Sequence, residues 1–300
     1  MIVMDEVFNT YKIEDIIEFS KSNKGRFRYY NGDNYIDFMW SPNGSMNLLV
    51  FFTAAVRRTS TFKLPAFSGM TSIGRVNANI LMISDPSLVI NEEIFLAWYA
   101  GSENFKCQPI IGEILYHLSN VFGCEKTVLY GGSAGGFASM YYSTYIPGAI
   151  SVSANPQTNI INYYERLVLL YLNTCFPSIM DEDLRKRILN TGIDYEVISH
   201  FLKSQNKLIY MQNSSDHHHI KNHFRPFLKG LGIEYEEKKE VVEKISDRIH
   251  LVMGDWGKGH KAPTKSMIFG TIDLLFDKNS NIDSHEFTSL LESLYFDSKL

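Results

Sequence analysis

A serine flanked by two pairs of glycines constrains the fold of this chain more than any other feature. The segment Gly131-Gly132-Ser133-Ala134-Gly135-Gly136 directly follows the apolar run 126–130 and directly precedes a helical pattern at 135–145. Small residues on both sides let a strand turn sharply into a helix, so that the serine Oγ stands exposed above the sheet. The alternative is a phosphate-binding turn at a helix N-terminus, but no Gly-Lys-Ser/Thr sequence follows. We therefore interpret Ser133 as a candidate nucleophile.

Short apolar runs alternate with helical patterns along the chain. This alternation predicts an α/β fold, a mostly parallel central sheet with flanking helices. The Tyr- and Phe-rich segment 26–40, with Asn31-Gly32 in its middle, predicts a hairpin. Strands are expected at 47–53, 77–84, 94–100, 126–130, 149–154, 207–211 and 249–253, and helices at 13–24, 106–121, 135–145 and 284–295.

We expect one compact domain over residues 1–300, because a chain of this length can bury about three-quarters of its surface. Residues 1–46 are interpreted as an N-terminal helix and hairpin extension. Residues 159–205 carry helical patterns only and lie between two predicted strands, so they form either a lid over the site or a plain helical crossover. The aromatic rings of this insertion either stack on sugars or are buried against the sheet: Tyr163, Tyr164, Tyr171 and Phe176.

A serine nucleophile needs a general base and a group that orients that base. In folds with this turn, the partners follow the serine in the order acid, then histidine, each on a loop after a strand. The run 207–211 leads into Asp216, and the run 249–253 leads into a glycine-containing loop that ends at His260. We predict Asp216 as the acid and His260 as the base. Asp255 shares the loop of His260 and is the rival acid.

Two backbone N–H groups must stabilise the oxyanion that forms during acyl transfer. One is expected from Ala134, the residue after the nucleophile. The other is expected from Ala54 or Ala55, which follow the early strand 47–53 and leave room for an acyl group. Arg57 comes next and either meets an anionic substrate or is simply solvated.

Four histidines at 217–219 and 223 raise the question of a metal site. His219 and His223 could share a helix face, but no cysteine or His-Glu-x-x-His pattern supports zinc. The segment 277–283 imitates a calcium loop, yet Ile282 stands where glycine is required and Thr288 where glutamate is required. We predict no metal and expect the histidines to pack around Asp216 and the substrate mouth.

Charge and cysteine content exclude several classes of partner. With 29 Lys and Arg against 33 Asp and Glu, the net charge of −4 offers no broad attraction to nucleic acid or an anionic membrane. The uncharged run 127–164 is interrupted by glycine and proline, so no transmembrane segment is expected. Three cysteines and an acidic start, Asp5-Glu6, argue against a secreted disulfide protein and predict a cytoplasmic location. The oligomeric state is not predicted.

At this point the chain resembles the α/β-hydrolase superfamily from about residue 47 to 270. More narrowly, it resembles bacterial α/β-hydrolase-like proteins of surface-polysaccharide biosynthesis, some of which are capsule O-acetyltransferases. The resemblance implies that Ser133, Asp216 and His260 form a triad. It also implies substrate contacts by Asn155, Gln157, His218 and Trp256. The peptides that carry it are Ser84-Asp85-Pro86, Ala97-Trp98-Tyr99-Ala100-Gly101, Gly132-Ser133-Ala134-Gly135-Gly136, Asn155-Pro156-Gln157-Thr158, Gln212-Asn213 and Trp256-Gly257-Lys258-Gly259-His260.

The activity expected from these residues is acyl transfer through an acyl-Ser133 intermediate. Attack by water would make an esterase, whereas attack by a sugar hydroxyl would make an O-acetyltransferase, with acetyl-CoA as the acyl donor. The partners are then a small acyl ester or a glycan acceptor. Two alternatives stay open: a general carboxylesterase on small esters, and a binding module without catalysis on the same fold.

Overall fold

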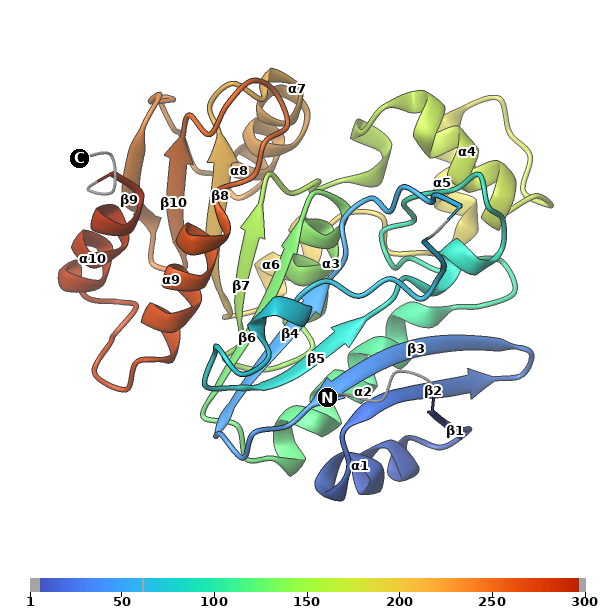
Figure 1. Ribbon diagram of the computed structural model, residues 1–300. Coiled ribbons are helices and arrows are strands. Elements are labelled where there is room, and N and C mark those ends of the chain that lie inside the picture. Colours follow the sequence, from blue (N-terminus) through green and yellow to red (C-terminus); the bar gives the residue numbers. More distant parts are fainter. Residues whose placement is uncertain (1–5, 61, 297–300) are drawn as a thin grey trace.

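The computed structural model describes residues 6–60 and 62–296 and arranges them around one ten-stranded sheet (Figure 1). The strands lie in the spatial order β1-β2-β3-β5-β4-β6-β7-β8-β10-β9. Their bounds are β1 (Val7–Thr10), β2 (Gly25–Asn31), β3 (Asn34–Ser41), β4 (Asn47–Phe52), β5 (Asn79–Ile83), β6 (Lys126–Gly132), β7 (Ile150–Ala154), β8 (Lys207–Asn213), β9 (Val241–Ser246) and β10 (Ile249–Gly254).

The middle of the sheet is parallel. Strands β5, β4, β6, β7, β8 and β10 pair in parallel with their neighbours, whereas β3 and β9 join antiparallel at the two sides. Every residue of β5 and β7 is buried, because helices cover both faces of a sheet of this kind. The predicted α/β class with a mostly parallel sheet is confirmed. The predicted hairpin is also confirmed: β2 and β3 pair antiparallel from Gly25↔Trp40 to Asn31↔Asn34.

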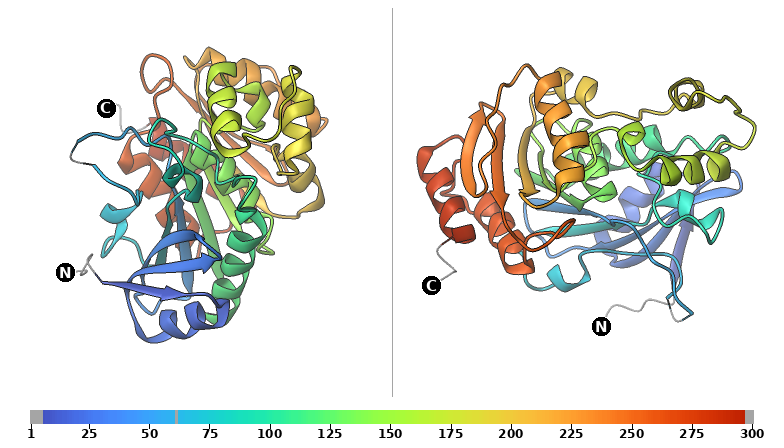
Figure 2. Two further views of the ribbon diagram at one scale, coloured as in Figure 1. Left: turned by 90° about the vertical axis from the view of Figure 1, so that its right-hand side faces the viewer. Right: turned by 90° about the horizontal axis from the view of Figure 1, so that it is seen from above.

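Two groups of helices bury the two faces of the sheet (Figure 2). One face carries α1 (Ile13–Ser22), α2 (Cys107–Val121), α3 (Ala134–Ser143), α6 (Ile198–Lys203) and α8 (Arg225–Gly230). The other carries α9 (Lys265–Phe276) and α10 (His285–Phe296). In the described part of the chain, no helix combines the length and the apolar character needed to cross a bilayer.

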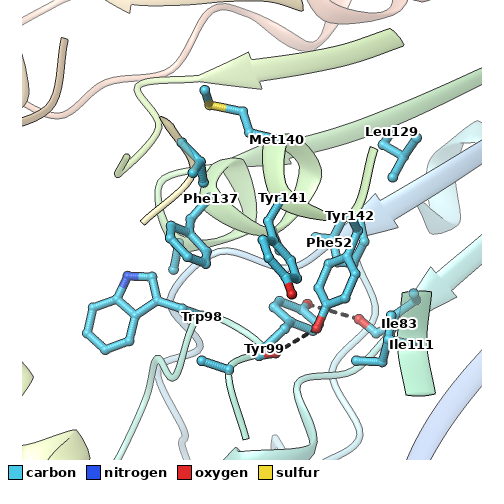
Figure 3. Close-up of a cluster of buried hydrophobic side chains, with 14 of the residues drawn as sticks. Phe52, Ile83, Trp98, Tyr99, Ile111, Leu129, Phe137, Met140, Tyr141 and Tyr142 are labelled. Carbon is cyan, nitrogen blue, oxygen red and sulfur yellow. Dashed lines mark hydrogen bonds between the residues drawn. The ribbon is translucent and has the colours of Figure 1, made fainter. Parts of the chain in front are cut away.

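The predicted strand at 94–100 is wrong, since this apolar segment is an irregular buried loop. Trp98 and Tyr99 have φ values of 56° and 57°, which a strand cannot accommodate. Side chains satisfy the backbone in place of a sheet ladder: the Tyr99 N–H donates to Asp85 Oδ2 at 2.9 Å. The Tyr99 hydroxyl in turn donates to the carbonyl oxygen of Ile83 at 3.0 Å. Figure 3 shows this loop packed beside α3, where the Tyr142 hydroxyl donates to the Tyr99 carbonyl at 2.7 Å.

The edge strands β1 and β9 are absent from the predictions. Both are short, and their sequences, Val-Phe-Asn-Thr and Val-Val-Glu-Lys-Ile-Ser, are as polar as the edges of sheets commonly are. The N-terminal elements continue the main sheet, because β3 pairs with β5. The 159–205 segment contains α4 (Glu165–Cys175), α5 (Leu184–Thr191) and α6. In Figure 1, α4 and α5 lie beyond the ends toward which the β6 and β7 arrows point. The lid role of this segment stays a prediction.

The turn from β6 into α3 brings two stretches of backbone into direct contact. A Cβ placed on Gly131 would lie 2.0 Å from the carbonyl oxygen of Gly135, which is far inside van der Waals contact. A Cβ on Gly132 would meet its nearest atom, the carbonyl oxygen of Ala154, only at 3.6 Å. The sharp turn therefore requires glycine at position 131 and tolerates a side chain at position 132.

These distances predict opposite outcomes for two neighbouring substitutions. Gly131→Ala should lower the free energy of unfolding by about 3 kcal/mol or more, because backbone must move to admit the methyl group. Gly132→Ala should stay within about 1 kcal/mol of the parent protein. Urea denaturation of both variants measures this difference, and equal stabilities would show that the turn is looser than the structure has it.

Candidate active site

Three predicted site residues follow three different strands of the parallel sheet. Ser133 follows β6, Asp216 follows β8, and His260 follows β10 on a longer loop. Because parallel strands end at the same edge of the sheet, residues far apart in sequence meet there.

Ser133 occupies a strained backbone conformation at the start of α3. Its φ and ψ are 55° and −119°, a region that residues with a side chain rarely adopt. The Ser133 N–H donates to the carbonyl oxygen of Ala154 at 2.9 Å, which ties the turn to β7. Ser133 is 8% exposed, so a small part of it reaches solvent through the pocket described below.

His260 is paired with Asp216 and not with Asp255. The distance from His260 Nδ1 to Asp216 Oδ2 is 2.5 Å, and the Asp216 side chain is buried whereas 40% of the His260 side chain is exposed. Asp255 instead forms an ion pair with Lys239 at 3.2 Å. Asp216 also caps α7 (His217–His219), because its Oδ1 accepts the His219 N–H at 3.3 Å. The capping role and the pairing role therefore belong to the same carboxylate.

A second imidazole lies against the same carboxylate. His219 Nδ1 is 3.0 Å from Asp216 Oδ2, and the His219 ring stacks on the His260 ring with centroids 4.1 Å apart. Burial alone would raise the pKa of Asp216, but hydrogen bonds and charge interactions with His219 and His260 hold that pKa below its usual range. Burial lowers the pKa of His219, which keeps that ring neutral near pH 7. Asp216 is thus ionised whenever His260 needs a partner.

Asp216, His219 and His260 also have the composition of a metal site. One potential ligand atom from each residue lies within 4.8 Å of the others. Among residues 6–60 and 62–296, these three form the group of histidine, cysteine or acidic side chains close enough to share a metal ion. The 2.5 Å contact of His260 Nδ1 with Asp216 Oδ2 is a hydrogen bond, whereas the 3.0 Å contact of His219 Nδ1 is an ion-pair distance without hydrogen-bond geometry. A zinc ion would lie about 2.0–2.2 Å from each ligand atom. Atoms arranged around it in this way are farther apart than 2.5 Å, so the three side chains would have to separate. The absence of a metal stays a prediction.

Two buried asparagines hold the loops of this site together. Asn213 Nδ2 donates to the carbonyl oxygens of Gly257 and Gly259 at 2.8 and 2.7 Å. Asn155 Oδ1 accepts the Asn213 N–H at 2.6 Å, and its Nδ2 donates to the carbonyl oxygen of Lys261 at 2.8 Å. Asn155 is only 1% exposed and connects two loops by hydrogen bonds. The expected substrate contact by Asn155 is therefore not what the structure shows.

Trp256 and His218 also differ from their expected roles. The Trp256 ring packs against the apolar cluster on the other face of the sheet, with its centroid 6.2 Å from that of Tyr295. It does not line the pocket, because Gly254 lets the indole fold back against its own strand end. The His218 ring stacks on the Tyr164 ring with centroids 3.9 Å apart. His218 therefore contacts a residue of the pocket wall but does not line the pocket itself.

A pocket of about 740 Å³ lies over Ser133 and His260. Tyr163 and Tyr164 line it, whereas Tyr171 and Phe176 are buried in the core. A second cavity of about 530 Å³ shares three of the lining residues, so the two cavities are neighbours beside α4. The larger pocket is lined by Ala54, Ala55, Arg57, Phe95, Ser133, Tyr163, Tyr164, Glu165, Arg166, Leu167 and His260.

Ala54 and Ala55, two of the expected oxyanion donors, line this pocket, and Ala134 directly follows Ser133. Thr53 cannot serve, because its N–H donates to the Tyr99 hydroxyl at 2.6 Å. Ala54 and Ala55 follow it and line the pocket beside Ser133. Ala134 is the first residue of α3, and an N–H in the first turn of a helix has no partner within the helix.

Ser133 Oγ has a partner that sequence reasoning missed. Gln157 Nε2 donates to it at 2.9 Å, while no hydrogen bond joins Ser133 to His260 in the described chain. Bonds between nucleophile and base are often long before substrate binds. Gln157 is an expected substrate contact, but its side chain is fully buried and does not line the pocket, so the structure brings it to Ser133 instead. Nothing in the sequence indicated that contact with the serine.

Comparisons with known proteins agree on the fold. No family model matches the chain, and no curated protein matches it. Among solved structures, it is similar to a capsule O-acetyltransferase of Neisseria meningitidis serogroup A. The likeness is at 14% identity over 78% of this chain and 87% of that one, with a TM-score of 0.54. A mutant of that protein in complex with CoA matches at 14% identity over 81% of this chain and 92% of that one, with a TM-score of 0.50. Pyrococcus horikoshii acylaminoacyl peptidase matches at 13% identity and a TM-score of 0.54, over 92% of this chain but 46% of its own. The fold is α/β-hydrolase-like.

Burial of His223 predicts how stability depends on pH. Burial, with repulsion by His219 and His218, lowers the pKa of His223 to about 2. Below pH 6.5 the unfolded chain binds a proton that the folded chain refuses, so the free energy of unfolding falls as pH falls. Between pH 7.5 and 5.0 this histidine should account for about 2 kcal/mol of lost stability. His223→Gln should remove that part of the loss.

Urea denaturation at the two pH values measures the difference for each variant. His117→Gln, which removes an exposed histidine from α2, is the matched control, and the difference between the two variants isolates the effect of the buried ring. An unchanged pH dependence in His223→Gln would mean that His223 is protonated in the folded chain.

Proposed function

We propose that this protein transfers an acyl group, through a covalent acyl-Ser133 intermediate, from acetyl-CoA to a hydroxyl of a carbohydrate. One observation carries the proposal: Ser133 in its strained turn and the Asp216-paired His260 line the same pocket. A nucleophile, a base and an orienting carboxylate on three strand ends are what acyl transfer needs.

Each group has a definite task in this mechanism. His260 Nε2 takes the Ser133 proton as Oγ attacks the acyl carbon, and later gives that proton to the leaving group. Asp216 fixes the tautomer of His260 through Nδ1 and stabilises the imidazolium. The N–H groups of Ala134 and of Ala54 or Ala55 hold the oxyanion. In the second half, His260 takes the proton of the acceptor hydroxyl as that oxygen attacks the acyl carbon, and returns it to Ser133 Oγ as the bond from Oγ to the acyl carbon breaks.

Charge in the pocket supports an anionic acyl donor. Arg57 and Arg166 both line the pocket, and guanidinium groups bind phosphate oxygens well. The capsule O-acetyltransferase with a similar fold is described in complex with CoA, whose phosphates would suit these arginines. The same neighbour and the resemblance to surface-polysaccharide proteins support a carbohydrate acceptor. Tyr163 and Tyr164 offer ring faces on which a sugar could stack.

Hydrolysis is the second candidate, because it shares the whole first half of the mechanism. The acylaminoacyl peptidase with a similar fold belongs to a hydrolytic class by its name. Water in place of the acceptor would make the protein an esterase on small esters. The cytoplasmic location also stays a proposal; the three cysteines are free thiols.

Removal of the nucleophile and of the acid tests the triad. Ser133→Ala should lower kcat for p-nitrophenyl acetate by about 10⁶. Asp216→Asn should lower it by about 10⁴, because asparagine stabilises the wrong tautomer of His260. Asp255→Asn is the matched control on the neighbouring loop and should have little effect. A Ser133→Ala variant with a tenth of the parent activity would overturn the assignment of the nucleophile.

The arginines test the donor. Arg57→Gln and Arg166→Gln should each raise KM for acetyl-CoA about 10-fold and leave the reaction with uncharged p-nitrophenyl acetate unchanged. Arg185→Gln, on the exposed side of α5, is the matched control.

The intact mass of the acylated protein, followed in the presence and absence of oligosaccharides, separates the two fates of the acyl group on Ser133. Transfer predicts faster loss of the adduct and a gain of 42 Da, roughly one acetyl group, on the glycan. Loss at the same rate with every glycan would make the protein an esterase.

A further inference from the structure

A chain of three polar groups runs through the core and ends on the candidate nucleophile. Trp98 Nε1 donates to Gln157 Oε1 at 2.5 Å, and Gln157 Nε2 donates to Ser133 Oγ at 2.9 Å. Trp98 and Gln157 are both fully buried, and Ser133 is the only member of the chain that reaches the pocket. A hydrogen-bonded chain buried in this way costs free energy unless each member has its partner.

The indole fixes which way the Gln157 amide points. An indole N–H can donate a hydrogen bond but cannot accept one, so the amide oxygen must face Trp98. The amide NH₂ must then face Ser133. Ser133 Oγ is thereby an acceptor from Gln157, which leaves its own O–H hydrogen free for another acceptor.

Both donors are held rigidly. The backbone N–H of Gln157 donates to the Ser133 carbonyl oxygen at 3.2 Å, so backbone and side chain of Gln157 both grip the serine. Trp98 lies in the buried loop with positive φ, and its ring meets that of Tyr171 edge-on with centroids 5.4 Å apart. Figure 3 draws Trp98 in the same buried cluster as Phe137 of α3, the helix that begins after Ser133. A left-handed backbone at a residue as large as tryptophan persists only where the surroundings enforce it.

We propose that Gln157 is a catalytic residue and Trp98 a positioning residue for acylation of Ser133, an inference that rests on the proposed function. As His260 takes the proton and the bond from Oγ to the acyl carbon forms, negative charge develops on Oγ and Gln157 Nε2–H stabilises it. The same N–H stabilises Oγ when it leaves the acyl-enzyme. Gln157 neither gains nor loses a proton; the proton moves from Ser133 to His260 and then to the leaving group. Trp98 acts only by preventing rotation of the amide.

The rate of Ser133 modification by a fluorophosphonate tests this without any knowledge of the natural substrate. In that reaction the bond from Oγ to phosphorus forms, fluoride leaves, and His260 accepts the proton. Gln157→Ala should slow labelling roughly 100-fold, the effect of a lost hydrogen bond to a charged oxygen. Trp98→Phe should slow it roughly 10-fold, because the amide can then turn its oxygen toward the serine. Intact mass measures the second-order rates.

A double variant separates positioning from packing. If Trp98 acts through Gln157, Trp98→Phe should cost nothing further in a chain that already carries Gln157→Ala. Trp40→Phe is the matched control, because Trp40 is equally buried and its Nε1 donates to the Ser20 carbonyl at 3.0 Å on α1. It should lower stability and leave the labelling rate of the folded protein unchanged. Gln157→Met keeps the length of the side chain but has no N–H to donate to Oγ, so it should label as slowly as Gln157→Ala.

The outcomes distinguish this inference from the proposed function. Failure of the parent protein to label at Ser133, or labelling of Ser133→Ala at the parent rate, would overturn both. Labelling that depends on Ser133 but is unchanged in Gln157→Met and Trp98→Phe would overturn the inference alone. Independent effects of the two positions in the double variant would also overturn it, since Trp98 would then act by packing.

Discussion

The contact between the end of β6 and the first turn of α3 is the constraint on which the site depends. The two backbone segments approach so closely that a methyl group on Gly131 would overlap the Gly135 carbonyl. That approach forces positive φ on Ser133 and puts its Oγ at the strand edge beside the first free N–H groups of α3. The proposed nucleophile and one proposed oxyanion donor therefore come from one turn, and their relative position is set by backbone packing.

Buried amides and an ionised acid complete the site around that turn. Asn155 and Asn213 connect the loops after β7, β8 and β10 by hydrogen bonds, so the glycine-containing loop that leads to His260 is held at several points. Asp216 lies between two imidazoles, and the hydrogen bond from His260 together with the close contact of His219 outweighs the cost of burying the carboxylate. An acid held ionised in this way keeps His260 in one tautomer, which is the state that general-base catalysis requires.

Local signals were enough to predict the strands and the turn at the centre of the molecule. Runs such as 48–52 and 208–211 are apolar throughout because both faces of their strands are covered, so they can be recognised without a structure. The segment 94–100 is also rich in apolar residues but is a loop. The side chains of Asp85 and Tyr99 form hydrogen bonds with buried backbone groups there, in place of pairing with a neighbouring strand. Hydrophobic pattern reports burial and does not report which hydrogen bonds satisfy the backbone.

The sequence by itself determined the α/β class, the position of the sharp turn at Ser133 and the loops that carry Asp216 and His260. Only the tertiary structure decided that Asp216 and not Asp255 meets His260, because that depends on which strand ends are neighbours. It also decided that Asn155 connects two loops, and that Trp98 and Gln157 reach the serine. Each of these contacts joins residues tens of positions apart. Tertiary packing sets the direction of side chains across such distances, and the local sequence does not specify that packing.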